Sequence, residues 1–176
     1  LPDRTGSLDF GLGGHLRIGG AVTVTVLGAF TPGTGTFEYN GAGAQTVASS
    51  LGNYNNLIIS GSNTKSLNAT VTVRGDLNVS SATLDLNSQT VNRASAGGTF
   101  TVANGASLLI GGAANFPSNY LAVSLGTTST VGYDRAGVQT VSAQVYGNLT
   151  LSGSGAKTMT GVSAVSGNLT LGGTAT

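Results

Sequence analysis

The chain repeats itself after 92 residues, and this repeat limits the folds that it can adopt. Residues 16–21 (LRIGGA) recur as residues 108–113 (LLIGGA), 92 positions further on. Residues 39–47 (YNGAGAQTV) match residues 133–141 (YDRAGVQTV) at a spacing of 94, so a turn has absorbed two extra residues. Such self-similarity is typical of repeat architectures, in which each unit packs against the next. We therefore predict one domain, residues 1–176, made of copies 1–92 and 93–176.

Short segments of alternating apolar and polar residues run through both copies. One side of each segment carries Val, Leu, Ile or Phe and the other carries Thr, Ser or Asn, which is the period-two pattern of a strand with one solvated face. Gly, Asn and Ser cluster where most segments end, and no apolar pattern of period 3.6 is long enough for a helix. The predicted strands are residues 21–26, 36–39, 57–59, 71–73, 77–79, 83–86, 99–102, 148–151 and 168–171.

Strands this short fit either an antiparallel sandwich or a solenoid of flat coils. Two sandwiches would need a linker and a complete second copy, but the junction near residues 93–95 is not linker-like, and Thr176 is the equivalent of Leu84. A solenoid tolerates such truncation because each coil contacts mainly its neighbours. The sequence thus predicts an all-β fold, a β-solenoid (parallel β-helix) with about four coils of roughly 20 to 25 residues per copy and a length of about 35 to 40 Å.

Composition narrows the range of partners and compartments. The chain has 7 Lys and Arg and 6 Asp and Glu residues, scattered singly, with a net charge of +1. Phosphate binding needs clustered basic residues, so we expect no nucleic-acid partner. There is no cysteine, and no run of apolar residues long enough to predict a membrane span. Because the chain begins at Leu1 rather than Met, we expect a removed secretion signal and an extracellular or cell-surface location.

The motif at residues 39–47 is followed by YNNL at 54–57, SGS at 60–62, Lys65 and VTV at 71–73. This series resembles the long repeat proteins secreted by bacteria, described as β-strand-repeat or filamentous-haemagglutinin-like surface proteins. The resemblance covers nearly the whole chain and marks architecture rather than activity. It implies an extracellular right-handed parallel β-helix or related solenoid that serves as a stalk, adhesin or fibre. The chain is short for an adhesin stalk, which favours a building block that assembles.

Few residues are suited to catalysis. Enzymes that cleave acidic polysaccharides on β-helices need clustered carboxylates with a cation or a basic residue. Only Asp3 with Asp9, and Asp134 beside Arg135, are close in sequence. Stacked coils can bring distant carboxylates together, so a hydrolase or lyase stays open as an alternative. The scarcity of such groups predicts a protein that is not an enzyme and has no cofactor or metal.

Other polar patterns have structural interpretations. His15 is interpreted as a surface turn residue, and residues 11–14 (GLGG) as a coil corner, because no helix follows them. Gln45 with Gln139, and Asn56 with Asn148, are expected to form hydrogen-bonded ladders at turns. The aromatic residues are expected to pack in the core or at corners, with a carbohydrate-binding stripe as the alternative; they are Phe37, Tyr39, Tyr54, Phe116, Tyr120, Tyr133 and Tyr146.

Two surface features also remain open. An ice-binding face would need Thr-x-Thr pairs at a constant coil spacing, and the pairs beginning at residues 23, 34, 70, 99 and 128 are spaced irregularly. Four Asn-x-Ser/Thr sequences, the pattern of glycan attachment sites, begin at Asn68, Asn78, Asn148 and Asn168. We interpret them as chance products of a strand composition rich in Asn, Ser and Thr, with glycan attachment as the alternative.

The ends of the chain carry the functional hypothesis. A solenoid without caps exposes unpaired backbone groups and an open apolar core at its terminal coils, and both ends of this chain have the repeat pattern. We therefore predict a self-associating subunit of a secreted bacterial filament that joins head to tail, with residues 1–5 adding a strand to a neighbour. The alternative is an adhesin or stalk fragment of a longer surface protein, with surface carbohydrate as a partner. The predicted interface residues are Leu1, Pro2, Leu8, Phe10, Leu169, Leu171, Thr174 and Thr176.

Overall fold

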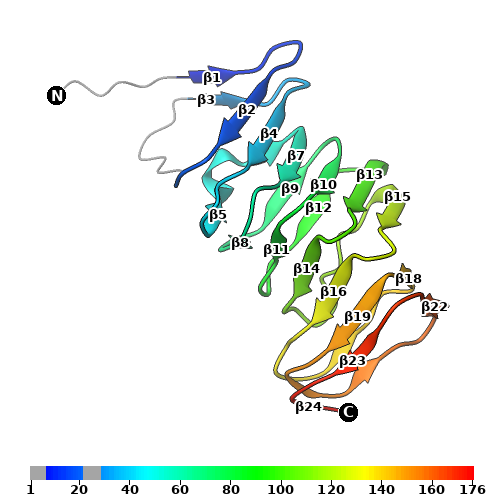
Figure 1. Cartoon of the computed structure of the whole chain (residues 1–176). Helices are drawn as coiled ribbons and strands as arrows, with labels where there is room; N and C mark the ends of the chain where they lie inside the picture. The colour runs from blue at the N-terminus through cyan, green and yellow to red at the C-terminus, as the bar shows by residue number, and fades with distance from the viewer. Residues whose placement is uncertain (1–6, 22–28) are drawn as a thin grey trace.

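The chain winds into a β-solenoid, as the repeat predicts. The structure is a computed structural model that describes residues 7–21 and 29–176. These residues form about 8 coils of short parallel strands, with β1 (Ser7–Asp9) at one end and β24 (Thr174–Ala175) at the other (Figure 1). The described residues contain no α-helix, and one short 3₁₀ turn, η1 (Ser49–Leu51), interrupts the strands.

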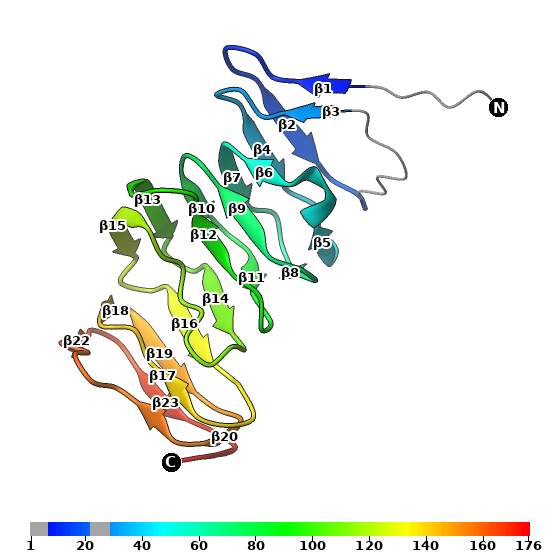
Figure 2. The ribbon, with the colours of Figure 1, turned by 180° about the vertical axis from the view of Figure 1, so that it is seen from behind.

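Three stacked sheets form the sides of the rod, and every pair of neighbouring strands is parallel (Figures 1 and 2). The first face is the six-stranded sheet of β2 (His15–Ile18), β4 (Thr36–Tyr39), β7 (Asn56–Ile59), β10 (Leu77–Val79), β13 (Gly97–Val102) and β15 (Tyr120–Leu125). The second face is the seven-stranded sheet of β5 (Gln45–Val47), β8 (Thr64–Leu67), β11 (Thr83–Asp85), β14 (Ser107–Ile110), β16 (Thr130–Tyr133), β19 (Asn148–Leu151) and β23 (Leu169–Leu171).

The third face is the three-stranded sheet of β6 (Asn53–Tyr54), β9 (Val71–Val73) and β12 (Val91–Arg93). Four two-stranded sheets complete the coils near the two ends. They are β1 with β3 (Ala29–Thr31), β17 (Gln139–Thr140) with β21 (Lys157–Thr158), β18 (Val145–Tyr146) with β22 (Ala164–Val165), and β20 (Ser154–Gly155) with β24.

Coil length follows from the strand register. The longest step joins Thr83 to Ser107, and one of the shortest joins Thr130 to Asn148, so a coil takes 18 to 24 residues. This range agrees with the length predicted from the sequence. All the predicted strands within the described residues are present, although several are shifted by a residue at one end. The predicted strand 21–26 lies mostly outside the described residues.

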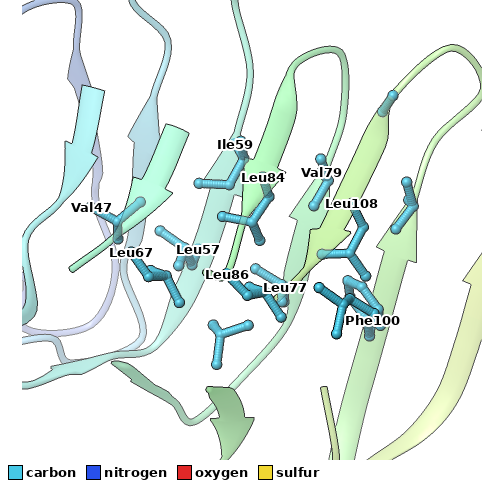
Figure 3. Close-up of a cluster of buried hydrophobic side chains, with 14 of the residues drawn as sticks. Val47, Leu57, Ile59, Leu67, Leu77, Val79, Leu84, Leu86, Phe100 and Leu108 are labelled. Atoms are coloured by element: carbon cyan, nitrogen blue, oxygen red, sulfur yellow. The ribbon is translucent and has the colours of Figure 1, made fainter. Parts of the chain in front are cut away.

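The core is a stack of identical inward positions from successive coils. Leu57, Leu77 and Phe100 are register partners on the first face and are fully buried. Figure 3 shows these side chains directed into the rod between the sheets, together with Leu84, Leu86 and Leu108. Period two places every second side chain inside, and burial of one Leu or Phe stabilises the fold by about 1.5 to 3 kcal/mol. The aromatic residues expected in the core are buried or packed against it.

The second copy of the repeat is displaced by one face from the first. β2, β4, β7 and β10 are consecutive strands of the first face. Their equivalents, 92 or 94 residues later, are β14, β16, β19 and β23, which are consecutive strands of the second face. From β2 to β13 the chain completes four coils and returns to the first face, and the next strand, β14, lies on the second face. One repeat, from β2 to β14, therefore advances the chain by four coils and one face. Equivalent surface residues of the two copies consequently lie on different sides of the rod.

Candidate functional site

Each copy contains a buried polar cluster at the same place in the repeat. Lys65 is fully buried, and its Nζ donates hydrogen bonds to the carbonyl oxygens of Gly41, Gly43 and Ser62 at 2.8, 2.8 and 2.7 Å. Burial lowers the pKa of Lys65. In the second copy, Lys157 binds the carbonyls of Arg135 and Gly137 in the same manner. All three ammonium hydrogens of Lys65 have acceptors, so this buried cation is part of the coil corner.

The glutamine beneath each lysine bridges two coils. Gln45 lies beside Lys65 in the register, and its Nε2 donates to the Ile18 carbonyl at 2.9 Å while its Oε1 accepts from the Gly41 amide at 2.9 Å. Gln139 repeats the first bond with the Ile110 carbonyl at 2.7 Å. The hydrogen bonds expected between coils are thus present, but Gln45 and Gln139 lie in strands and bind backbone groups. They do not form a side-chain ladder at a turn.

A pair of buried tyrosines ties a loop to the core in each copy. The hydroxyl groups of Tyr39 and Tyr54 are 2.9 Å apart, the Tyr54 hydroxyl donates to the Ala48 carbonyl, and the Tyr39 hydroxyl accepts from the Ala48 amide. Tyr133 and Tyr146 repeat this arrangement. Burial raises the pKa of all four hydroxyls. The four hydroxyls therefore stay protonated at neutral pH, and their hydrogen bonds hold the loop against the core.

His15 lies in strand β2, so its interpretation as a turn residue is wrong. Its Nε2 is 2.8 Å from Glu38 Oε2, and Arg17 Nε is 2.9 Å from the same oxygen. The Ser60 hydroxyl donates to the other carboxylate oxygen at 2.5 Å. The neighbouring strand β4 supplies the carboxylate that contacts both side chains, and the distance between these residues in the sequence hid the contact. Ser60 bonds to Glu38 and not to His15, so the cluster lacks the serine–histidine contact of a nucleophilic site.

Two carboxylates far apart in sequence share a surface hollow of about 330 Å³ at one edge of the second face. Asp85 ends β11 and Asp134 follows β16, with Gly111 on the coil between them. Burial and the negative charge of Asp85 raise the pKa of Asp134. One Asp85 oxygen accepts from the Asn87 amide at 2.8 Å. Within the described residues, no group of three or more His, Cys, Asp or Glu side chains is placed to hold a metal ion.

The C-terminal coil leaves its apolar interior open. Leu169 and Leu171 stack on Leu149 and Leu151, which are buried, so they occupy inward positions of the coil. They are nevertheless 47% and 68% exposed. A cavity of about 150 Å³ opens beside them, lined by Leu151, Lys157, Met159, Leu171, Ala175 and Thr176. Within the described residues, the last coil thus presents an apolar surface and a strand edge, that of β23, with no neighbour on its outer side.

The predicted C-terminal interface residues lie together at this end. Thr174 in β24 pairs with Ser154. The Thr176 carbonyl accepts from the Lys157 amide at 2.9 Å. Neither β23 nor β24 has a strand on its outer side among the described residues.

The opposite end presents the edges of β1 and β2. In the described part of the chain, β1 pairs only with β3 and β2 pairs only with β4. Phe10 is half-buried and packs edge-on against Phe30 and Phe37, with both ring centroids 6.1 Å away. Leu8 is the register partner of Phe30. The predicted interface residues Leu1 and Pro2 lie outside the described residues.

No protein-family description, curated protein sequence or solved structure matches this chain. The resemblance to secreted bacterial repeat proteins therefore stays a prediction. No helix in the described residues has the length and apolarity needed to cross a membrane.

The sequence did not predict the burial of Lys65 and Lys157, nor the contacts of His15 and Arg17 with Glu38. The lysine signal was available, because Lys65 and Lys157 are equivalent in the two copies and each follows a glutamine on the coil before it. A residue retained in both copies at an inward strand position indicates a structural role even when its side chain is charged. The Glu38 cluster had no such signal, because its equivalent in the second copy is Gly132.

Proposed function

We propose that this protein is a structural subunit of a secreted extracellular filament, which grows head to tail when the C-terminal coil of one molecule receives the N-terminal coil of the next. The observation that carries this proposal is the exposure of Leu169 and Leu171 at inward positions of the last coil. The equivalent residues of the first copy, Leu77 and Val79, are fully buried by the coil that follows them.

The energetics favour growth at the ends. Leu169 and Leu171 are 47% and 68% exposed, so their burial by another coil contributes about 1 to 2 kcal/mol each, before the cost of association. Parallel strand pairing would also satisfy the backbone groups along the outer edge of β23. The two ends of the rod differ, so such a contact is heterologous and generates an open filament.

The sides of the rod support a structural role. Each side is a continuous sheet of hydrogen-bonded strands, and across the sides the outward positions are mainly Thr, Ser and Asn. The described Thr-x-Thr pairs are distributed among the faces: the pairs beginning at Thr34 and Thr99 lie by the first face, the pair at Thr70 by the third and the pair at Thr128 by the second. The pair at residues 23 and 25 lies outside the described residues. The described pairs provide no continuous flat array of the kind that ice binding needs.

The test is electron microscopy of the purified protein as its concentration is raised. We expect thin fibres with a subunit rise of about 42 Å, because two repeats advance the rod by eight coils and two of its three faces, at about 4.8 Å per coil. The variant Leu169→Asp/Leu171→Asp should remain as short rods. Leu121→Asp is the matched control, because Leu121 is 79% exposed on the side of the rod, and it should form fibres. Wild-type protein that stays as short rods at every concentration would refute the proposal.

A further inference from the structure

The molecule contains an internal example of the contact that one copy of the repeat makes with the next. At this junction β10 of the first copy pairs with β13, which begins the second copy. Leu77 lies opposite Phe100, Asn78 opposite Thr101, and Val79 opposite Val102. The four apolar residues of this pairing are fully buried, so the internal junction is a well-packed interface.

The two free edges of the molecule are the equivalents of these paired strands. β23 lies 92 residues after β10 and pairs with β19 alone within the described residues. β1 lies 92 residues before the central part of β13, and in the part of the chain that the structure describes it pairs only with β3, as β13 pairs with β15 on that side. The edge of β23 therefore lacks a strand like β13, which β1 resembles, and the edge of β1 lacks a strand like β10, which β23 resembles.

We infer that β23 of one molecule pairs in parallel with β1 of a second copy in the register of the internal junction. Leu169 then lies opposite Leu8, Thr170 opposite Asp9, and Leu171 opposite Phe10. This inference rests on the proposed filament function and specifies its partner and register. Farther along the same coil, β24 then lies beside the free edge of β2, as β11 lies beside β14.

The side-chain chemistry of the two edges agrees with this register. Leu169 and Leu171 face inward, and Phe10 already packs against the core through Phe30 and Phe37. Thr170 and Asp9 are exposed and fall at the outward position between them. A shift by one residue would set Asp9 opposite Leu169 or Leu171, so a carboxylate would lie against an apolar inward position and the inward positions of the two strands would no longer coincide.

This register also sets the rotation between molecules. β23 belongs to the second face, whereas β1 precedes β2 in the chain as β6 precedes β7 and so occupies the third face. The third face of each molecule thus continues the second face of the one before it. A given surface feature returns to the same side of the fibre only at every third molecule.

Disulfide cross-linking tests the register, because the wild-type chain contains no cysteine. Directly opposed residues of parallel strands are about 4.8 Å apart, which suits a disulfide. The double variant Asp9→Cys/Thr170→Cys should form a ladder of covalent oligomers under mild oxidation. Ser7→Cys/Thr170→Cys is the comparison, because residue 7 is displaced by two residues along the strand from Asp9. Its yield should be lower by about tenfold, because the two Cα atoms lie beyond disulfide range.

Mixing the single variants Asp9→Cys and Thr170→Cys separates head-to-tail contact from other association. The mixture should yield a covalent dimer of one molecule of each kind, and neither variant alone should cross-link. Fibres in the microscope with cross-linking preferred for the Ser7 pair would overturn the register and leave the filament intact. Neither fibres nor cross-links would overturn both.

Discussion

At the scale of the residue, buried polar groups rather than apolar ones distinguish this core. An outward Thr or an inward Leu can be exchanged for a similar residue at modest cost, but buried Lys65 donates to three backbone carbonyl oxygens, and no apolar side chain can replace these bonds. Sequence patterns predicted the apolar positions correctly. They did not predict β8, because a lysine at an inward position breaks the alternation expected of a strand.

Replacement of Lys65 by methionine should destabilise the fold strongly. The variant Lys65→Met keeps most of the side-chain volume and removes the ammonium donor from the Gly41, Gly43 and Ser62 carbonyls, of which Gly41 keeps the Ser62 amide at 3.3 Å. We therefore expect a loss of about 2 to 4 kcal/mol in the free energy of unfolding. Urea denaturation monitored by circular dichroism measures it. Arg74→Met, at an exposed position, is the control and should change stability by less than about 0.5 kcal/mol. Equal stability of the two variants would contradict the structural role of Lys65.

Glu38 should make stability depend on acidic pH. Burial raises its pKa, but hydrogen bonds from Ser60 and Arg17 and the charges of Arg17 and His15 outweigh burial, so the net pKa is below the ordinary 4.5. A lowered folded pKa means stability that is present above pH 4.5 and lost as pH falls through the folded pKa. The difference in melting temperature between wild type and Glu38→Gln should therefore shrink between about pH 6 and about pH 3. A constant difference would show that Glu38 does not carry this linkage.

At the scale of the element, glycines allow the corners of successive coils to stack closely. Gly61 has φ of +75°, and a Cβ there would be 2.5 Å from the carbonyl oxygens of Asn40 and Gly41 on the preceding coil. Its equivalent Gly153 has the same φ and faces the Arg135 carbonyl. The glycine-rich turns of the sequence predict where strands end. Only the stacked coils show which glycine has no room for a side chain.

The variant Gly61→Ala should lose about 2 to 3 kcal/mol of stability, because alanine is strained at positive φ and its Cβ displaces the coil below. Gly43→Ala is the control, since an added Cβ at Gly43 meets no atom within 4 Å. Thermal melts of both variants compare the two positions. A melting temperature for Gly61→Ala equal to that of Gly43→Ala would contradict the close contact between coils.

At the scale of the whole molecule, a repeat of four coils and one face places the two copies on different sides of one rod. The shift follows from the chain length between equivalent strands, and it has no local signature in either copy. Its consequence is that equivalent surface residues of the two copies lie on different sides of the rod. In the proposed filament, association through the ends is then the contact that every copy of the repeat can make.

Fibre growth should be insensitive to salt. The proposed pairing of residues 169–171 with residues 8–10 contains one charged side chain, Asp9, which has no charged partner across the contact. Because screening acts on charge pairs, the elongation rate should change by less than about twofold between about 50 mM and about 500 mM sodium chloride. Light scattering with preformed fibre seeds measures this rate. A steep fall in the rate with salt would indicate growth through ion pairs rather than apolar stacking.

The sequence by itself determined that this chain is a β-solenoid, where eight of its described strands lie and which side of those strands faces inward. These features follow from local alternation and from the repeat, because each coil packs on a neighbour built to the same pattern. Only the tertiary structure decided which residues meet across coils. Glu38 contacts His15 and Arg17, Lys65 donates to the Gly41 carbonyl, and Asp85 and Asp134 line one surface hollow. Each of these arrangements joins residues that are distant along the chain. Their partners depend on the number of residues in each coil, which varies from 18 to 24 and which turn lengths alone do not reveal.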